Sequence, residues 1–103
     1  MLYQQGDVII QSTHEIPKKA TKSDPSERGF VLAEGEVTGH AHVIDPVFAT
    51  LFTTEDERFL QVHKSATVKH EEHGNITLPK GNYKLKIVKE YDHFDEEARE
   101  VRD

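Results

Sequence analysis

Four of the seven histidines in this 103-residue chain stand in two closely spaced pairs. The first pair is His40 and His42, and the second is His70 and His73, in the string His-Glu-Glu-His. Neutral imidazole is the side chain that most often binds metal ions in proteins. On a β-strand, residues two apart point to the same face, so His40 and His42 can reach one ion. The spacing therefore predicts a metal site.

The second pair reaches the same ion only if the chain turns between its two members. On a straight strand His70 and His73 would point to opposite faces, but a Gly-Asn dipeptide directly after them favours a turn. His70 continues the alternation from Val68, so we expect its side chain to face inward. The expected metal ligands are His40, His42 and His70, with His73 as the fourth.

Imidazole ligands, with or without a carboxylate, suit several divalent transition metals. Zn, Fe, Ni, Mn and Cu all fit, and the spacing does not select one of them. Three imidazoles plus a carboxylate or a water leave an open coordination position, as a catalytic centre needs. In that case Glu72 or Glu36 is the expected acid or base, and the ion would polarise a substrate oxygen or activate water or O2. A closed site would be structural, so an enzymatic role stays open.

The same histidines have a second interpretation without metal. Paired histidines can form a polar rim, and the chain would then be a non-enzymatic interaction module whose acidic C-terminal segment docks a partner protein. Clustered histidines also titrate near pH 6.5, so a pH-responsive protein is a third interpretation. The other histidines are expected outside the cluster. The alternation of the strand sets His63 on the face opposite to the apolar residues before it, so we expect it to face away from their core. We expect His14 and His93 in solvent.

Composition excludes several other kinds of site. The chain has no cysteine, which rules out disulfides, thiolate zinc sites and cysteine nucleophiles. A formal net charge of −6 argues against nucleic acid as a partner, because phosphate binding needs a basic face. No stretch approaches the ~18 apolar residues of a membrane span, and the first residues lack the pattern of a signal peptide. We therefore expect a cytoplasmic protein without a membrane partner.

The segments that must position the histidines have the patterns of short strands. Runs of β-forming residues occur at 7–13, 30–33, 43–44, 47–53, 59–63, 66–70 and 83–87. Phe94, Ala98 and Val101 have helical spacing, so the C-terminal segment is expected to form a short helix or a docked tail. We predict one domain over residues 1–103, an all-β fold that is a small antiparallel sandwich or barrel. An edge strand in so small a domain favours a homodimer.

Two segments of the chain resemble the two-part signature of the cupin superfamily. In that signature a glycine precedes His-x-His and a carboxylate, and a later glycine leads to Pro-x-Gly and a third histidine; segments 35–42 and 74–84 match in kind. Asp45 comes too early for the expected glutamate, and Lys84 occupies the place of the last histidine. The resemblance implies a cupin-like metalloenzyme in which a histidine of the 70–73 string replaces the missing ligand.

A closer resemblance spans nearly the whole chain. Its blocks are Gln-Gly-Asp-Val at 5–8, Leu-Ala-Glu-Gly-Glu-Val-Thr-Gly-His-Ala-His at 32–42, His-Glu-Glu-His at 70–73 and Glu-Tyr-Asp at 90–92. These blocks resemble a family of small, uncharacterised bacterial and phage proteins of about this length. That family implies no activity, so the functional expectation continues to rest on the histidines.

Overall fold

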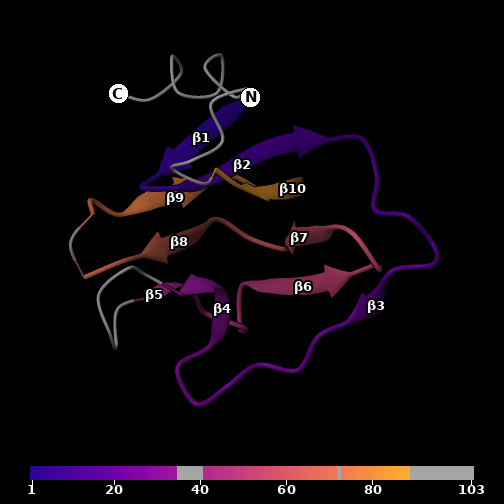
Figure 1. Ribbon diagram of the computed structural model, residues 1–103, viewed down its shortest axis with the longest axis horizontal. Coiled ribbons are helices and arrows are strands. Elements are labelled where there is room, and N and C mark those ends of the chain that lie inside the picture. Colours follow the sequence, from indigo (N-terminus) through magenta and orange to yellow (C-terminus); the bar gives the residue numbers. More distant parts are fainter. Residues whose placement is uncertain (35–40, 72, 89–103) are drawn as a thin grey trace.

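The computed structural model describes residues 1–34, 41–71 and 73–88, and all regular structure in these ranges is β-strand (Figure 1). The strands are β1 (Leu2–Gln5), β2 (Val8–Thr13), β3 (Thr21–Lys22), β4 (Phe30–Glu34), β5 (Ala41–Ile44), β6 (Ala49–Thr53), β7 (Arg58–Val62), β8 (Ala66–Lys69), β9 (Ile76–Leu78) and β10 (Gly81–Ile87). The described part of the chain contains no helix that could cross a membrane. The segment for which we predicted a C-terminal helix or tail lies outside the described residues.

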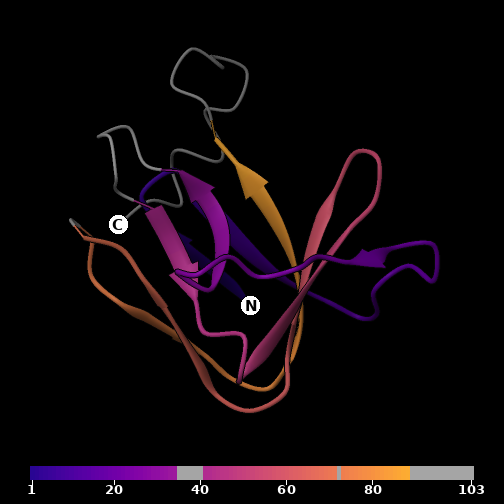
Figure 2. The ribbon, with the colours of Figure 1, turned by 90° about the horizontal axis from the view of Figure 1, so that it is seen from below.

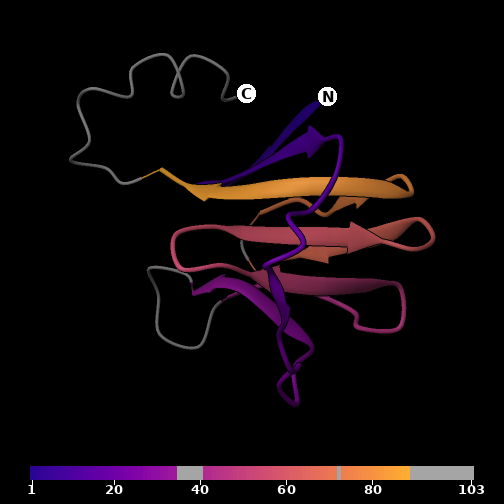
Figure 3. The same ribbon diagram turned by 90° about the vertical axis from the view of Figure 1, so that its right-hand side faces the viewer.

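The strands form two antiparallel sheets. The larger sheet has the strand order β1-β2-β10-β7-β6-β3, and the smaller has the order β4-β5-β8-β9. The two sheets form two layers of an open sandwich and do not close into a barrel (Figure 2). In a second view, β10, β7 and β6 run side by side in the larger sheet (Figure 3). The prediction of a small all-β fold is therefore confirmed, as a sandwich.

The hydrophobic core lies between the two sheets. The larger sheet contributes Ile10 and Leu60, and the smaller contributes Ile44, Val68 and Leu78; none of the five is more than 1% exposed. Burying a side chain of this size stabilises a fold by roughly 1.5–3 kcal/mol. The packing of these residues fixes the distance between the two sheets, and therefore also the distance between the polar groups at their ends.

An arginine joins the sheets at the edge strand β4. The pairing of β4 with β5 shifts register between Val31 and Ala33, which turns consecutive residues toward the core. The guanidinium of Arg58 on β7 donates to the carbonyl oxygens of Val31 and Leu32 at this irregularity. These two hydrogen bonds connect β7 of the larger sheet to β4 of the smaller sheet.

The β1–β2 turn brings the larger sheet close to the smaller one. Gln5 pairs with Val8, so Gly6 and Asp7 form a two-residue turn. Gly6 has a φ of 56°, which suits the first central position of a type II′ hairpin turn. The backbone N–H of Val88 donates to the carbonyl oxygen of Asp7 at 2.8 Å, which holds the turn from the side of β10.

Candidate metal centre

The register of β5 and β8 brings two of the predicted histidines together. Val43 pairs with Lys69 and Ile44 with Val68, so the same antiparallel register continued by one residue sets His42 opposite His70. The ring centroids of these two histidines lie 4.3 Å apart. His73 lies close by in the β8–β9 connection.

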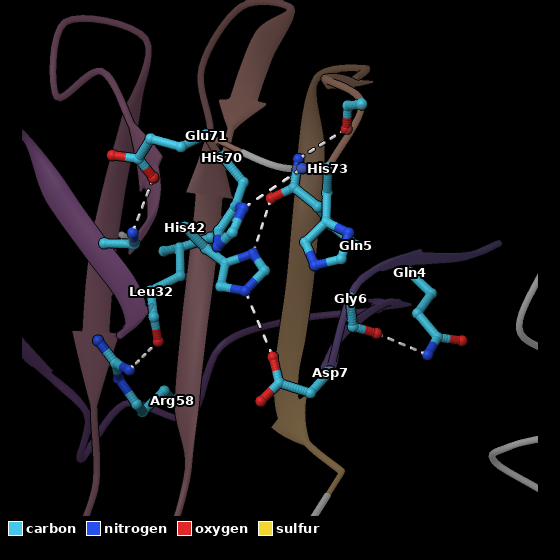
Figure 4. A network of polar contacts seen from close by, with 12 residues as sticks. Gln4, Gln5, Gly6, Asp7, Leu32, His42, Arg58, His70, Glu71 and His73 are labelled. Atoms are coloured by element: carbon cyan, nitrogen blue, oxygen red, sulfur yellow. Dashed lines mark hydrogen bonds and ion pairs between the residues drawn. The ribbon is translucent and has the colours of Figure 1, made fainter. Parts of the chain in front are cut away.

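The three imidazole rings form one cluster (Figure 4). The ring of His73 lies 4.6 Å from that of His70 and 6.0 Å from that of His42. His42 is the inner member, with only 1% of its surface exposed. His70 is half-buried and His73 is exposed, so the cluster extends from the protein interior to the surface.

A buried glutamine determines which nitrogen of His42 carries a proton. The side-chain amide of Gln5 donates to the carbonyl oxygens of Val68 at 3.0 Å and Gly74 at 2.9 Å. An inverted amide would place its oxygen against both carbonyl oxygens, so the orientation is fixed by chemistry. The amide oxygen of Gln5 therefore faces Nδ1 of His42 at 2.8 Å and accepts its N–H. In the neutral ring, Nε2 keeps its lone pair.

Nε2 of His42 faces a carboxylate. Oδ1 of Asp7 lies 3.3 Å from Nε2 of His42, and the side chain of Asp7 is 36% exposed. Burial lowers the pKa of His42 most strongly, and the neighbouring His70 and His73 lower this pKa further. The negative charge of Asp7 and its hydrogen bond raise the pKa of His42, but the net shift is downward. The neutral form of this imidazole is therefore favoured more than in a free histidine.

Gly6 lies directly against the rings. A Cβ atom added at this position would be 2.6 Å from Nε2 of His73 and 3.3 Å from Cε1 of His42. The backbone conformation also disfavours other residues, because the φ of 56° is in the left-handed region. The turn can approach the histidines this closely only with a glycine at position 6.

Glu71 ties the start of β5 to the segment that carries His70 and His73. Its Oε1 accepts the backbone N–H of Ala41 at 3.0 Å, and its Oε2 lies 3.6 Å from the guanidinium of Arg28. These contacts hold the backbone beside His42 and His70 where the β5–β8 ladder ends.

The structure thus brings together three of the four predicted ligands, namely His42, His70 and His73. His40, Glu36 and Glu72 lie outside the described residues, as does His93. His14 and His63 are exposed, in agreement with the sequence, and Nε2 of His63 lies 2.7 Å from the hydroxyl of Thr50.

The rings do not have ligand geometry as they stand. Across residues 1–34, 41–71 and 73–88, no three His, Asp or Glu side chains are arranged to hold one metal ion. One reason is that Nδ1 of His70 accepts the backbone N–H of His73 at 3.4 Å. Joint coordination therefore requires the more accessible rings of His70 and His73 to rotate.

Sequence reasoning missed Gln5, Gly6 and Asp7 as members of the cluster. The Gly-Asp dipeptide is a local signal that predicts a hairpin turn at this position. Its contact with His42 is not local, because the two segments meet only when the sheets pack.

Lowering the pH is expected to destabilise the metal-free protein. The pKa of His42 is below its ordinary value of 6.5 in the folded state, so the unfolded chain takes up this proton first. The contribution of His42 to the free energy of unfolding is then fully present above about pH 6.5, and it is lost as the pH falls through the pKa of the folded state. Urea unfolding in the presence of a chelator between pH 8 and 5.5 measures the effect. His42→Gln should flatten the pH dependence of the free energy of unfolding, whereas His63→Gln should not change it. Equal slopes for the unaltered protein and both variants would show that His42 is not responsible for the pH dependence.

Comparison with known proteins identifies one family. The family described as "Domain of unknown function (DUF8820)" matches residues 4–88. This range contains the whole described cluster and excludes the acidic C-terminal segment. No curated protein and no solved structure shows a significant match to the chain.

Proposed function

The chain belongs to the DUF8820 family, and we propose that it binds a divalent transition-metal ion through His42, His70 and His73. The observation that carries this proposal is the hydrogen bond of 2.8 Å between Nδ1 of His42 and the fixed amide oxygen of Gln5. Histidines that ligate metals almost always donate their other ring N–H to an oxygen, which sets the tautomer and aims the free nitrogen at the ion. His42 already has this arrangement.

The electrostatics of the cluster favour a cation other than the proton. Three imidazoles with ring centroids no more than 6.0 Å apart would repel one another if they were all protonated. Burial lowers the pKa of His42 in the same direction. A divalent ion can instead be shared by several neutral imidazoles, each of which supplies a lone pair.

The two outer histidines have room to complete the coordination. His70 is half-buried and His73 is exposed, and exposed side chains change rotamer within nanoseconds. The fixed ligand is the buried one, His42, whereas the adaptable ligands lie toward solvent. This order suits an ion that enters from the surface. His40 remains a further proposed ligand from the sequence, and Glu36 or Glu72 the proposed acid or base if the bound ion serves a reaction.

The proposal is tested with tag-free protein that has been stripped with a chelator and titrated with ZnCl2 in a calorimeter at pH 7.5. We expect saturable binding of one ion per chain. His42→Gln should weaken binding by about 100-fold, because removing a ligand costs at least as much as the 10–100-fold loss seen for outer-shell partners. His63→Gln, an exposed histidine outside the cluster, is the matched control and should bind as the unaltered protein does.

Two results would overturn the proposal. The first is the absence of saturable binding by the unaltered protein with Zn²⁺, Ni²⁺, Mn²⁺ or Fe²⁺. The second is an equal effect of His42→Gln and His63→Gln, which would assign the uptake to surface histidines. Either result would favour the interpretation of the cluster as a structural polar network in an interaction module.

A further inference from the structure

The carboxylate of Asp7 is held in place by the backbone of its own turn. The carbonyl oxygen of Asp7 accepts the N–H of Val88 at 2.8 Å, and that of Gly6 accepts the side-chain amide of Gln4 at 2.8 Å. The pairing of Gln5 with Val8 closes the turn on both sides. The backbone of Asp7 is therefore fixed from three directions, and its side chain extends toward His42 (Figure 4).

The side chains of Asp7 and His42 face each other across the two sheets. Since Gln5 accepts the Nδ1 proton, Nε2 is the nitrogen of His42 that faces Oδ1 of Asp7. The pair sets one ring nitrogen and one carboxylate oxygen 3.3 Å apart, and Nε2 of His73 lies against the same turn at Gly6.

The spacing of these two atoms is that of two ligands of one ion. Zinc bonds to imidazole nitrogen and to carboxylate oxygen are about 2.0–2.2 Å long, and tetrahedral coordination then sets neighbouring ligand atoms roughly 3.3–3.5 Å apart. Nε2 of His42 and Oδ1 of Asp7 are 3.3 Å apart without any rearrangement. The two atoms therefore fit two neighbouring ligand positions of a tetrahedral site.

From this geometry we infer that Asp7 is an oxygen ligand of the proposed site, so that the ligand set combines imidazoles with one carboxylate. The inference rests on the proposed function and deepens it by naming a ligand from the other sheet. His42 and the His70–His73 pair belong to the smaller sheet and its β8–β9 connection, whereas Asp7 belongs to the larger sheet. The bound ion therefore bridges the two layers of the sandwich.

A mixed nitrogen and oxygen ligand set also defines the class of ion. Carboxylate oxygen suits harder cations such as Mn²⁺, and imidazole suits Zn²⁺, Ni²⁺ and Fe²⁺, whereas Cu(I) prefers sulfur ligands. The site should accept divalent ions across this series. Without the carboxylate, the affinity for the harder ions should fall more than that for Ni²⁺.

The test compares Asp7→Asn and Asp7→Ser with Asp24→Asn, which removes the same charge from an exposed position in the β3–β4 connection. Asn and Ser both follow glycine commonly in two-residue hairpin turns, so either change should keep the turn. Stripped full-length proteins are titrated with Zn²⁺ and Mn²⁺ against a chromophoric chelator. We expect both Asp7 variants to bind about tenfold or more weakly, with a larger loss for Mn²⁺ than for Zn²⁺.

Asp24→Asn should bind as the unaltered protein does. The absorption spectrum with Co²⁺ provides a second readout, because the intensity of its visible bands reports ligand number and type; it should change in the Asp7 variants alone. Unchanged affinity and spectrum in a folded Asp7 variant would overturn the inference and leave the histidine site intact. Absence of binding by the unaltered protein would instead remove the proposed function itself, so the two failures are distinguishable.

Discussion

Replacing Gln5 with methionine is expected to lower the free energy of unfolding by about 2 kcal/mol or more. The change leaves three polar groups without a partner: the carbonyl oxygens of Val68 and Gly74, and Nδ1 of His42. Each buried polar group left unpaired costs roughly 1–3 kcal/mol. This penalty applies to the Val68 carbonyl and to Nδ1 of His42, because Gly74 is exposed and water can hydrate its carbonyl. Urea unfolding at pH 7.5 measures the loss. Gln11→Met, at an exposed position on β2, is the control and should change stability little.

A second variant at Gln5 separates the structural role from the role in setting the tautomer. Gln5→Glu keeps an acceptor for Nδ1 of His42 but loses the two donors to the backbone carbonyls. We expect it to be destabilised and yet to retain the Nδ1–H form, as read from the ring nitrogen chemical shifts. In Gln5→Met the proton is released to move to Nε2, where Asp7 accepts it. A loss of less than about 1 kcal/mol in Gln5→Met would show that the three bonds do not act as described.

Replacing Gly6 with alanine is expected to weaken metal binding and stability together. The left-handed φ of 56° costs an L-residue about 1–2 kcal/mol. The new methyl group would also overlap the imidazole of His73, at 2.6 Å from Nε2. His73 is exposed and can swing away, so the overlap is relieved at the expense of the cluster. We expect the affinity for Zn²⁺ to fall by about tenfold or more, as for other changes that disturb ligand orientation.

Gly81→Ala is the matched control for Gly6→Ala. Gly81 also has a positive φ, of 155°, but an added Cβ would meet only ordinary contacts, the nearest at 3.7 Å from the hydroxyl oxygen of Tyr83. This variant should lose some stability and keep its affinity for Zn²⁺. If Gly6→Ala binds Zn²⁺ as tightly as Gly81→Ala does, the contact of the turn with His73 has no part in binding.

Much of the fold is encoded in local patterns, and the exceptions lie at the sheet edges. The alternation of apolar and polar residues in 83–87 predicts the strand β10. In the structure Tyr83 and Leu85 face the core, and Lys84 and Lys86 face solvent. Ile87 breaks the pattern at the strand end, where it is 41% exposed. The strands β1, β3 and β9 were not predicted. All three are edge strands, which are short and bury less apolar surface than central ones.

The candidate site was predictable only in part, for a similar reason. Each histidine pair is visible as a local pattern, but the meeting of His42 with His70 depends on the β5–β8 register. The contacts of His42 with Gln5 and Asp7 join residues on different sheets, so they depend on how the sandwich packs. No spacing rule connects positions so far apart in the chain, whereas the Gly-Asp turn that makes the approach possible is a local signal.

The most direct test of the central claim is a crystal of the tag-free protein grown with ZnCl2 and measured on both sides of the zinc absorption edge. The account predicts one strong anomalous peak between His42 and Asp7, about 2.0–2.2 Å from Nε2 and from the carboxylate oxygen. The rings of His70 and His73 should be turned toward this peak. A map with no peak there, or with peaks only at exposed histidines such as His14 and His63, would contradict the account.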